Sequence, residues 1–98
     1  MIVQWSPVSL ERIQEIADYI AEDSRIAAGN WVDEIFKKVE KLKSNPEIGR
    51  IVPELGIPDI RELLFGNYRI IYLISKKNIS ILTVRHFKQL LPVDEIIS

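Results

Sequence analysis

The stretch from Ile60 to Leu91, IRELLFGNYRIIYLISKKNISILTVRHFKQLL, decides the fold of this chain. It holds three apolar runs of strand length: Ile60 to Phe65, Tyr68 to Ser75 and Asn78 to Phe87. Gly66-Asn67, which tolerate the positive φ of primed hairpin turns, join the first two, and the weaker turn sequence Lys76-Lys77 joins the last two. The pattern predicts three consecutive antiparallel strands.

Positive charge is concentrated in the same stretch. Its cations are Arg61, Arg69, Lys76, Lys77, Arg85 and Lys88, and Glu62 is its one acid, so six against one give a local charge of +5 in a chain whose net charge is −1. A cationic sheet in an acidic protein predicts a polyanionic or acidic partner. The pI of 5.8 argues against a general nucleic-acid coat protein.

Two helices are predicted upstream of these strands, after a short first strand over residues 2–5. Ser6 is expected to cap the first helix, and Pro7 suits its first turn. Apolar residues recur at helical spacing from Leu10 to Ile20, and the charged residues between them, Arg12 and Glu15 among them, are expected to face water. Ser24 can cap a second helix, which should end near Ser44-Asn45-Pro46.

These elements predict a single α+β domain over residues 1–98, with the helices gathered on one side of an antiparallel sheet. The first strand is expected at the edge or the centre of that sheet. Residues 46–58, with three prolines and two glycines, read as a loop. The apolar tail, residues 88–98, is expected to form a short final helix over the sheet or to be a mobile segment ordered by a partner.

Composition limits the classes of function. The chain has 98 residues and no cysteine, which excludes a disulfide framework and a thiolate metal site. No apolar run approaches the length of a membrane span, and the N-terminus carries charges too early for a secretory signal. We therefore expect a cytoplasmic protein with no membrane association, no metal and no cofactor.

Arginines are the main candidates for binding. Guanidinium groups bind phosphate and carboxylate through two parallel hydrogen bonds, so Arg50, Arg61, Arg69 and Arg85 are candidate anion ligands. The alternative for Arg50 and Arg61 is an ion pair with a nearby acid of the chain, such as Glu47, Glu54, Asp59 or Glu62. His86 could act as a general acid or base, or simply hydrogen-bond a neighbouring loop. Tyr68 could stack on nucleic-acid bases or pack in the core.

Strand register decides which of these residues meet. With two-residue turns in both hairpins, Tyr68 lies opposite Phe65 and Arg85, and Arg61 lies on the face of Tyr68 and Arg85. Arg69 then shares the other face with His86. A slip of one residue in the second hairpin would exchange these partners.

Four strings of the chain resemble the RelE/ParE superfamily of type II toxin–antitoxin toxins. They are VQWSPVSLERIQEIADYIAED from Val3, LKSNPEIGRIVPEL from Leu42, IRELLFGNYRIIYLI from Ile60 and ISILTVRHFKQLL from Ile79. Each is weak alone, but together they occur in the family's order and spacing. The resemblance implies the β-α-α-β-β-β order, and a growth-inhibiting toxin that a cognate antitoxin neutralises and that reaches operator DNA only through that antitoxin.

The superfamily splits by activity. RelE-like members cut mRNA on the ribosome without a metal, and ParE-like members, including the plasmid-stabilisation branch, poison DNA gyrase. For the nuclease branch the resemblance makes Arg69, Arg85 and His86 the catalytic candidates. For target binding it leaves Arg50, Arg61, Tyr68 and Lys88, although Arg61 matches the family's pattern only loosely.

Departures from the nuclease pattern favour the ParE-like branch. Ile60 and Glu62 stand near the positions of a lysine pair, Phe87 stands where a tyrosine is expected, and the chain is acidic overall. We therefore expect gyrase as the target. The alternatives are a ribosome-dependent mRNA endoribonuclease and a non-toxic module that still binds antitoxin.

Overall fold

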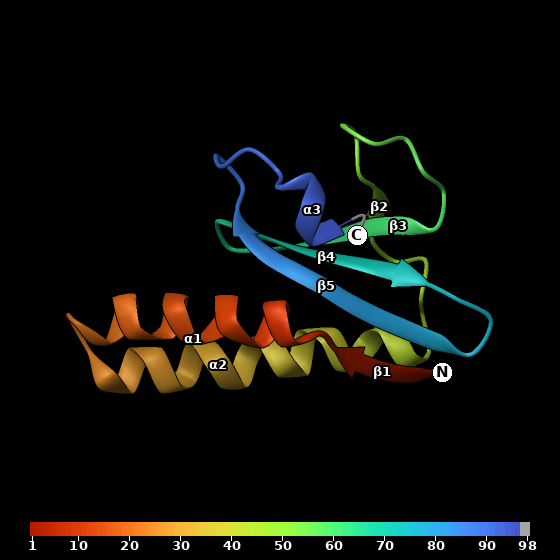
Figure 1. Cartoon of the computed structure of the whole chain (residues 1–98). Coiled ribbons are helices and arrows are strands. Elements are labelled where there is room, and N and C mark those ends of the chain that lie inside the picture. The colour runs from red at the N-terminus through yellow and green to blue at the C-terminus, as the bar shows by residue number, and fades with distance from the viewer. Residues whose placement is uncertain (97–98) are drawn as a thin grey trace.

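The computed structural model describes residues 1–96 of the chain. Its elements are β1 (Ile2–Trp5), α1 (Pro7–Ala21), α2 (Arg25–Glu40), the 3-10 turn η1 (Lys41–Lys43), β2 (Arg50–Ile51), β3 (Ile60–Phe65), β4 (Tyr68–Ile74), β5 (Asn78–His86) and α3 (Val93–Ile96). Helices α1 and α2 lie side by side on one side of the sheet, and α3 lies on the other (Figure 1). The predicted α+β class is confirmed.

Helices α1 and α2 begin at the predicted caps. The Ser6 side chain accepts a hydrogen bond from Ser9 N at 3.0 Å, and Ser24 accepts one from Ala27 N at 3.1 Å. Each cap satisfies an N–H group that has no partner within its helix. Helix α2 ends at Glu40, and the turn η1 continues the chain to Lys43, close to the predicted end.

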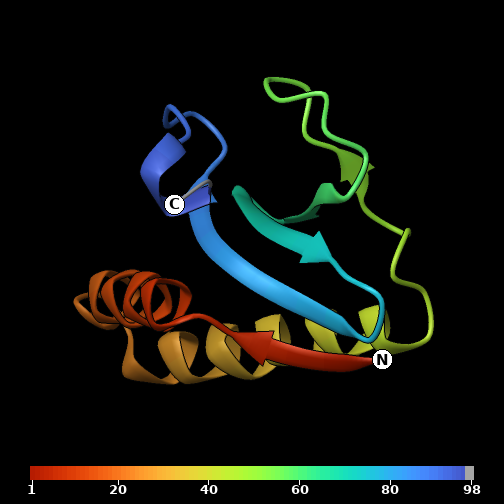
Figure 2. The same cartoon turned by 45° about the vertical axis from the view of Figure 1, so that its right-hand side comes forward.

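The sheet has the strand order β1-β5-β4-β3-β2. Strands β3, β4 and β5 are antiparallel neighbours, as predicted, and β1 lies at one edge, parallel to β5 (Figure 2). Because parallel neighbours need a crossover connection, the helical pair carries the chain from β1 to the rest of the sheet. Only Gly66 has positive φ (56°) in the first hairpin turn.

A β-bulge in β5 corrects the predicted register. The second hairpin starts as a two-residue turn, with Ile74 opposite Ile79, but Leu82 is left without an opposite residue because Ile71 pairs with Thr83 and Tyr72 with Ile81. Every pair beyond the bulge is therefore shifted by one. Tyr68 lies opposite His86 instead of Arg85, and Arg69 lies opposite Arg85. The predicted partner of Tyr68 was therefore wrong, and so was the prediction that Arg69 shares a face with His86.

The two faces of the sheet bury separate clusters. The helix-facing cluster contains Ile35, Leu42, Ile70, Tyr72 and Ile81 among others, all fully buried. The opposite cluster contains Val52, Ile60, Ile71 and Ile96. Helix α3 therefore covers part of the second face, as one of the two predictions for the tail proposed, and residues 97–98 of that tail lie outside the described residues.

The predicted loop over residues 46–58 contains the short strand β2, which sequence analysis missed. Gly49, just before it, lies so close to the sheet that a Cβ atom there would be 2.5 Å from the Glu62 carbonyl oxygen. The Gly49 N–H donates to the Tyr72 hydroxyl at 3.0 Å, and that hydroxyl donates to the Pro46 carbonyl at 2.7 Å. The Asn45-Pro46 and Gly49-Arg50 strings thus hold this loop against β4.

Candidate functional site: a cleft beside α1 and two ion-pair networks

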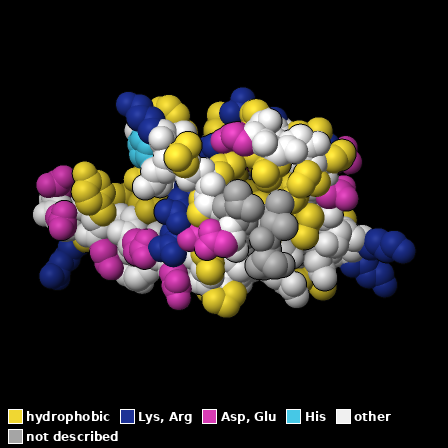
Figure 3. All heavy atoms as spheres, turned by 45° about the horizontal axis from the view of Figure 1, so that its top comes forward, with side chains coloured by type: hydrophobic (Ala, Val, Ile, Leu, Met, Phe, Trp, Pro, Cys, Tyr) yellow, Lys and Arg dark blue, Asp and Glu magenta, His cyan; other side chains and the backbone are white. Residues whose placement is uncertain are grey.

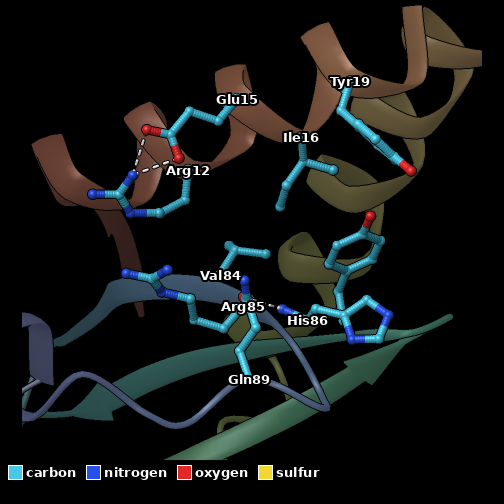
Figure 4. Close-up of a pocket in the computed structure, with 9 residues that line it drawn as sticks. Arg12, Glu15, Ile16, Tyr19, Val84, Arg85, His86 and Gln89 are labelled. Atoms are coloured by element: carbon cyan, nitrogen blue, oxygen red, sulfur yellow. Dashed lines mark hydrogen bonds and ion pairs between the residues drawn. The ribbon is translucent and has the colours of Figure 1, made fainter. Parts of the chain in front are cut away.

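A cleft of about 200 Å³ opens between α1 and the end of β5. In Figure 4, Ile16 and Tyr19 extend from α1 toward Val84 and His86. The cleft is lined by Arg12, Glu15, Ile16, Tyr19, Tyr68, Val84, Arg85, His86 and Gln89. The structure therefore brings together three of the predicted site residues, Tyr68, Arg85 and His86.

Aromatic rings form one wall of this cleft. The Tyr68 and His86 rings have centroids 5.6 Å apart and meet edge to face, and Tyr68 packs in the same way on Trp31 at 5.4 Å. Burial raises the pKa of the Tyr68 phenol. His86 Nδ1 accepts a hydrogen bond from Lys88 N at 3.2 Å, so a neutral His86 carries its proton on Nε2. The Tyr68 ring is thus part of the core and also part of the cleft.

Glu95 of α3 is the centre of the first ion-pair network. Its carboxylate accepts from Thr83 Oγ1 at 2.8 Å and Arg85 Nη2 at 2.6 Å, and lies 3.2 Å from Arg12 Nη2. Burial opposes the charged form, but the hydrogen bonds from Thr83 and Arg85 outweigh it and lower the pKa of Glu95. The network joins α1, β5 and α3 and engages Nη2 of Arg85, whose buried Nε has no hydrogen-bond partner among residues 1–96.

Arg69 belongs to the second network, on the α3 side of the sheet. Its Nε donates to Glu62 Oε1 at 2.6 Å, and its Nη1 and Nη2 donate to the Glu54 carboxylate at 2.6 and 2.8 Å. Glu62 also accepts from Arg50 Nε at 2.5 Å. The hydrogen bonds that Arg69 donates to Glu54 and Glu62 raise the pKa of Arg69, and those that Glu54 accepts from Arg69 lower the pKa of Glu54. Arg69 is 5% exposed and Glu62 is 1% exposed.

Arg61 has a structural role in this arrangement. Its Nη1 donates to the Gly49 carbonyl at 3.0 Å, which ties β3 to the turn before β2. No acid of residues 1–96 forms an ion pair with Arg61, so the predicted pairing with a nearby acid is confirmed for Arg50 and not for Arg61.

The expected cationic recognition face is not formed by Arg69 and Arg85, which is a correction to the sequence analysis. Both guanidinium groups lie against carboxylates of the chain itself, because Glu54, Glu62 and Glu95 reach them from other elements. On the side of the molecule that carries α3, Lys and Arg side chains form small separate groups with Asp and Glu beside several of them (Figure 3). Arg50 and Lys88 stay exposed.

Sequence analysis missed the contribution of α1. Arg12, with a side chain 20% exposed, was expected to face water, but it reaches Glu95. The spacing of Arg12, Glu15, Ile16 and Tyr19 places all four on one face of a helix, and this was the signal that could have identified the cleft. Nothing in the local sequence marked Glu54 or Glu95 as partners of Arg69 and Arg85.

Residues 1–96 contain neither a cluster of metal-binding side chains nor a helix that could span a membrane. Over residues 1–96, no three His, Asp or Glu side chains gather where they could hold a metal ion. In the same part of the chain, every helix is too short or too polar to cross a bilayer.

A known protein family matches most of the chain. Residues 3–91 match the family model described as the ParE toxin of the type II toxin–antitoxin system, parDE. The chain is 36% identical over 92 residues to the candidate toxin Y4kP of Sinorhizobium fredii (strain NBRC 101917 / NGR234), covering 92% of each chain. A solved structure of a chromosomal ParDE toxin–antitoxin system from P. aeruginosa superposes with a TM-score of 0.73 at 21% identity, covering 88% of this chain and 95% of that one.

Proposed function

The chain belongs to the ParE toxin family of type II toxin–antitoxin systems, and from that premise we propose that it inhibits growth by acting on DNA gyrase until a cognate antitoxin binds it. The toxin would act in the cytoplasm, where gyrase lies. Any contact with operator DNA would be made by the antitoxin and not by this chain.

The hydrogen bonds that Arg69 makes within the chain bear on whether the target is gyrase or mRNA. A nuclease of the RelE type would need free guanidinium donors for the scissile phosphate, since binding in two parallel hydrogen bonds uses both Nη groups. Arg69 gives both of these groups to Glu54, and Arg85 donates to Glu95. A phosphate could therefore bind either arginine only after a carboxylate of the chain has left, and the match of residues 3–91 to the ParE family adds to the support for a protein target.

The cleft end of the molecule is our candidate for the target-binding surface. Tyr68, His86 and Tyr19 line the cleft, and the Tyr19 side chain is 70% exposed. Exposed Lys88 lies two residues after His86 in the chain. Tyrosine is enriched at protein-binding surfaces, and a charged side chain at the rim, such as that of Lys88, can steer an oppositely charged partner. Arg50 and Arg61, the other predicted binding residues, lie at the β2 edge of the sheet. Arg50 pairs with Glu62, and Arg61 donates to the turn before β2.

Expression without antitoxin tests whether the chain is a toxin at all. We expect growth to stop after induction and to recover when the gene next to the toxin gene is expressed with it. Unchanged growth with abundant folded protein would favour the non-toxic antitoxin-binding module. A translating extract provides the second arm, and mRNA cut at the ribosome would instead support the nuclease, with Arg69, Arg85 and His86 as its catalytic residues.

A further inference from the structure

A second pocket, of about 540 Å³, lies beside Arg69 on the α3 side of the sheet. Arg50, Glu54 and Arg69 form its charged part. Leu64 and Phe87 form its apolar part and are 51% and 48% exposed. A pocket with a guanidinium fork at one end and exposed apolar side chains at the other can take an acid that carries an apolar neighbour.

The Arg69 guanidinium is held ready for such an acid. Its Nε donates at 2.6 Å to Glu62, whose side chain has no exposed surface and is itself held by Arg50. This bond fixes the plane of the guanidinium and directs Nη1 and Nη2 toward the pocket. A binding group held in place before its ligand arrives loses little entropy on binding.

Glu54 fills this position in the free chain, and it is the replaceable member of the pair. Its side chain is 50% exposed, against 6% for the side chain of Arg69. The loop around it is anchored by fully buried Val52, whose carbonyl accepts from Leu55 N at 3.1 Å and Gly56 N at 3.0 Å. Glu54 can therefore leave by rotating its side chain while the loop stays in place.

The network gains a net positive charge when Glu54 leaves Arg69. Arg50 and Arg69 balance Glu54 and Glu62, so the closed network is neutral. Once Glu54 turns outward, the pocket contains two cations and one anion. The pocket then attracts an external anion, and Leu64 and Phe87 select one that is attached to an apolar group.

We propose that Glu54 is an internal substitute for a carboxylate of a partner protein. That partner presents an aspartate or glutamate next to an apolar side chain; the carboxylate binds Nη1 and Nη2 of Arg69, and the apolar side chain packs on Leu64 and Phe87. The inference rests on the proposed function only in taking the partner to be a protein. It adds an exchange of carboxylates at Arg69, which keeps this site closed until the partner binds.

Titration of the purified full-length chain by NMR tests the exchange, with the Arg69 Nε–H resonance as the readout. The probes are acetyl-Leu-Glu-amide, acetate and inorganic phosphate. We expect Glu54→Gln to bind the dipeptide at least about tenfold more tightly than the unaltered chain does, since the competing internal charge is gone. Asp59→Asn is the matched control, because it removes the charge of an exposed acid of the same loop, and it should bind as the unaltered chain does. Equal affinity in Glu54→Gln and Asp59→Asn would overturn the proposal, as would phosphate binding more tightly than the dipeptide.

The unaltered chain supplies a second measurement, and a variant of the apolar part of the pocket accompanies it. In the unaltered chain, saturating dipeptide should move the Glu54 carboxyl carbon resonance toward that of a solvent-exposed glutamate. Leu64→Ser should weaken the binding of the dipeptide and leave the binding of acetate unchanged. A Glu54 resonance that stays fixed while the dipeptide binds would contradict the exchange. No gyrase enters these titrations, so their failure is separate from a failure of the toxin assays.

Discussion

Arg69 and Arg85 lie directly opposite each other on β4 and β5, and their guanidinium groups bind different carboxylates. Like charges in facing positions of a sheet destabilise it unless each is compensated. Glu62 of β3 and Glu54 of the loop before β3 bind Arg69, and Glu95 of α3 binds Arg85. The two arginines therefore stabilise the fold in the free chain, and removal of a buried acid that pairs with them should lower the free energy of unfolding.

Glu62→Gln should be strongly destabilising. The variant keeps the shape of the side chain but leaves Arg50 and the Nε of buried Arg69 without their acid. We expect the free energy of unfolding in urea to fall by roughly 3 kcal/mol, as for other buried pairs that lose one partner. A loss below about 1 kcal/mol, the ordinary size of an exposed pair, would show that this network contributes little.

Two glycines should respond in opposite directions to alanine. Gly49→Ala places a Cβ atom 2.5 Å from the Glu62 carbonyl and 2.6 Å from the Tyr72 hydroxyl, and should cost about 1–3 kcal/mol. Gly29→Ala, on the exposed surface of α2, meets nothing within 4 Å and should stabilise the chain by about 1 kcal/mol through helix propensity. Thermal unfolding of both variants gives the comparison, and a stabilised Gly49→Ala would contradict the packing of the loop.

Removal of the Tyr72 hydroxyl should loosen the same loop. Tyr72→Phe leaves the Gly49 N–H and the Pro46 carbonyl without their shared partner, which should cost about 1–3 kcal/mol. Tyr19→Phe removes a hydroxyl from a side chain that is 70% exposed and should be neutral. Amide hydrogen exchange at Gly49 is the direct measurement, and unchanged protection in Tyr72→Phe would refute the contact.

Acid should unfold the chain partly through Glu95. Its folded pKa lies below the ordinary value of 4.5, so the unfolded chain binds more protons in the interval between the two values. The stabilisation is complete above that ordinary value and is lost as the pH falls through the folded pKa. Urea midpoints from about pH 6 to about pH 3 should therefore drop less steeply for Glu95→Gln than for the unaltered chain. Glu11→Gln, an exposed acid of α1, should retain the full slope, and parallel curves for all three proteins would exclude this role of Glu95.

Local sequence signals predicted most of the fold. Ser6 and Ser24 marked the helix starts, and Gly66 marked the first hairpin, since each acts through neighbours in the sequence. The bulge at Leu82 had no such signal, because an extra residue in a strand needs neither glycine nor proline. One unpaired residue was enough to exchange the partners of Arg85 and His86.

The candidate site was harder to predict for a related reason. Arg12 and Glu95 come from opposite ends of the chain, and only the packing of α3 across β5 joins them. Arg69 was identified correctly as a residue of interest, but its state depends on Glu54 from a loop without regular structure. Residue types predicted the chemistry, and tertiary packing decided which charges remain free.

A supercoiling assay with purified gyrase and the purified chain tests the central claim most directly. The account predicts that supercoiling is inhibited and that the inhibition is weakened by Tyr19→Ala in the cleft and by Lys88→Glu, two residues beyond β5. Lys37→Glu, on the exposed surface of α2, should leave it unchanged. Full supercoiling activity of gyrase in an excess of the chain would contradict this account, provided that expression of the same chain stops growth in cells.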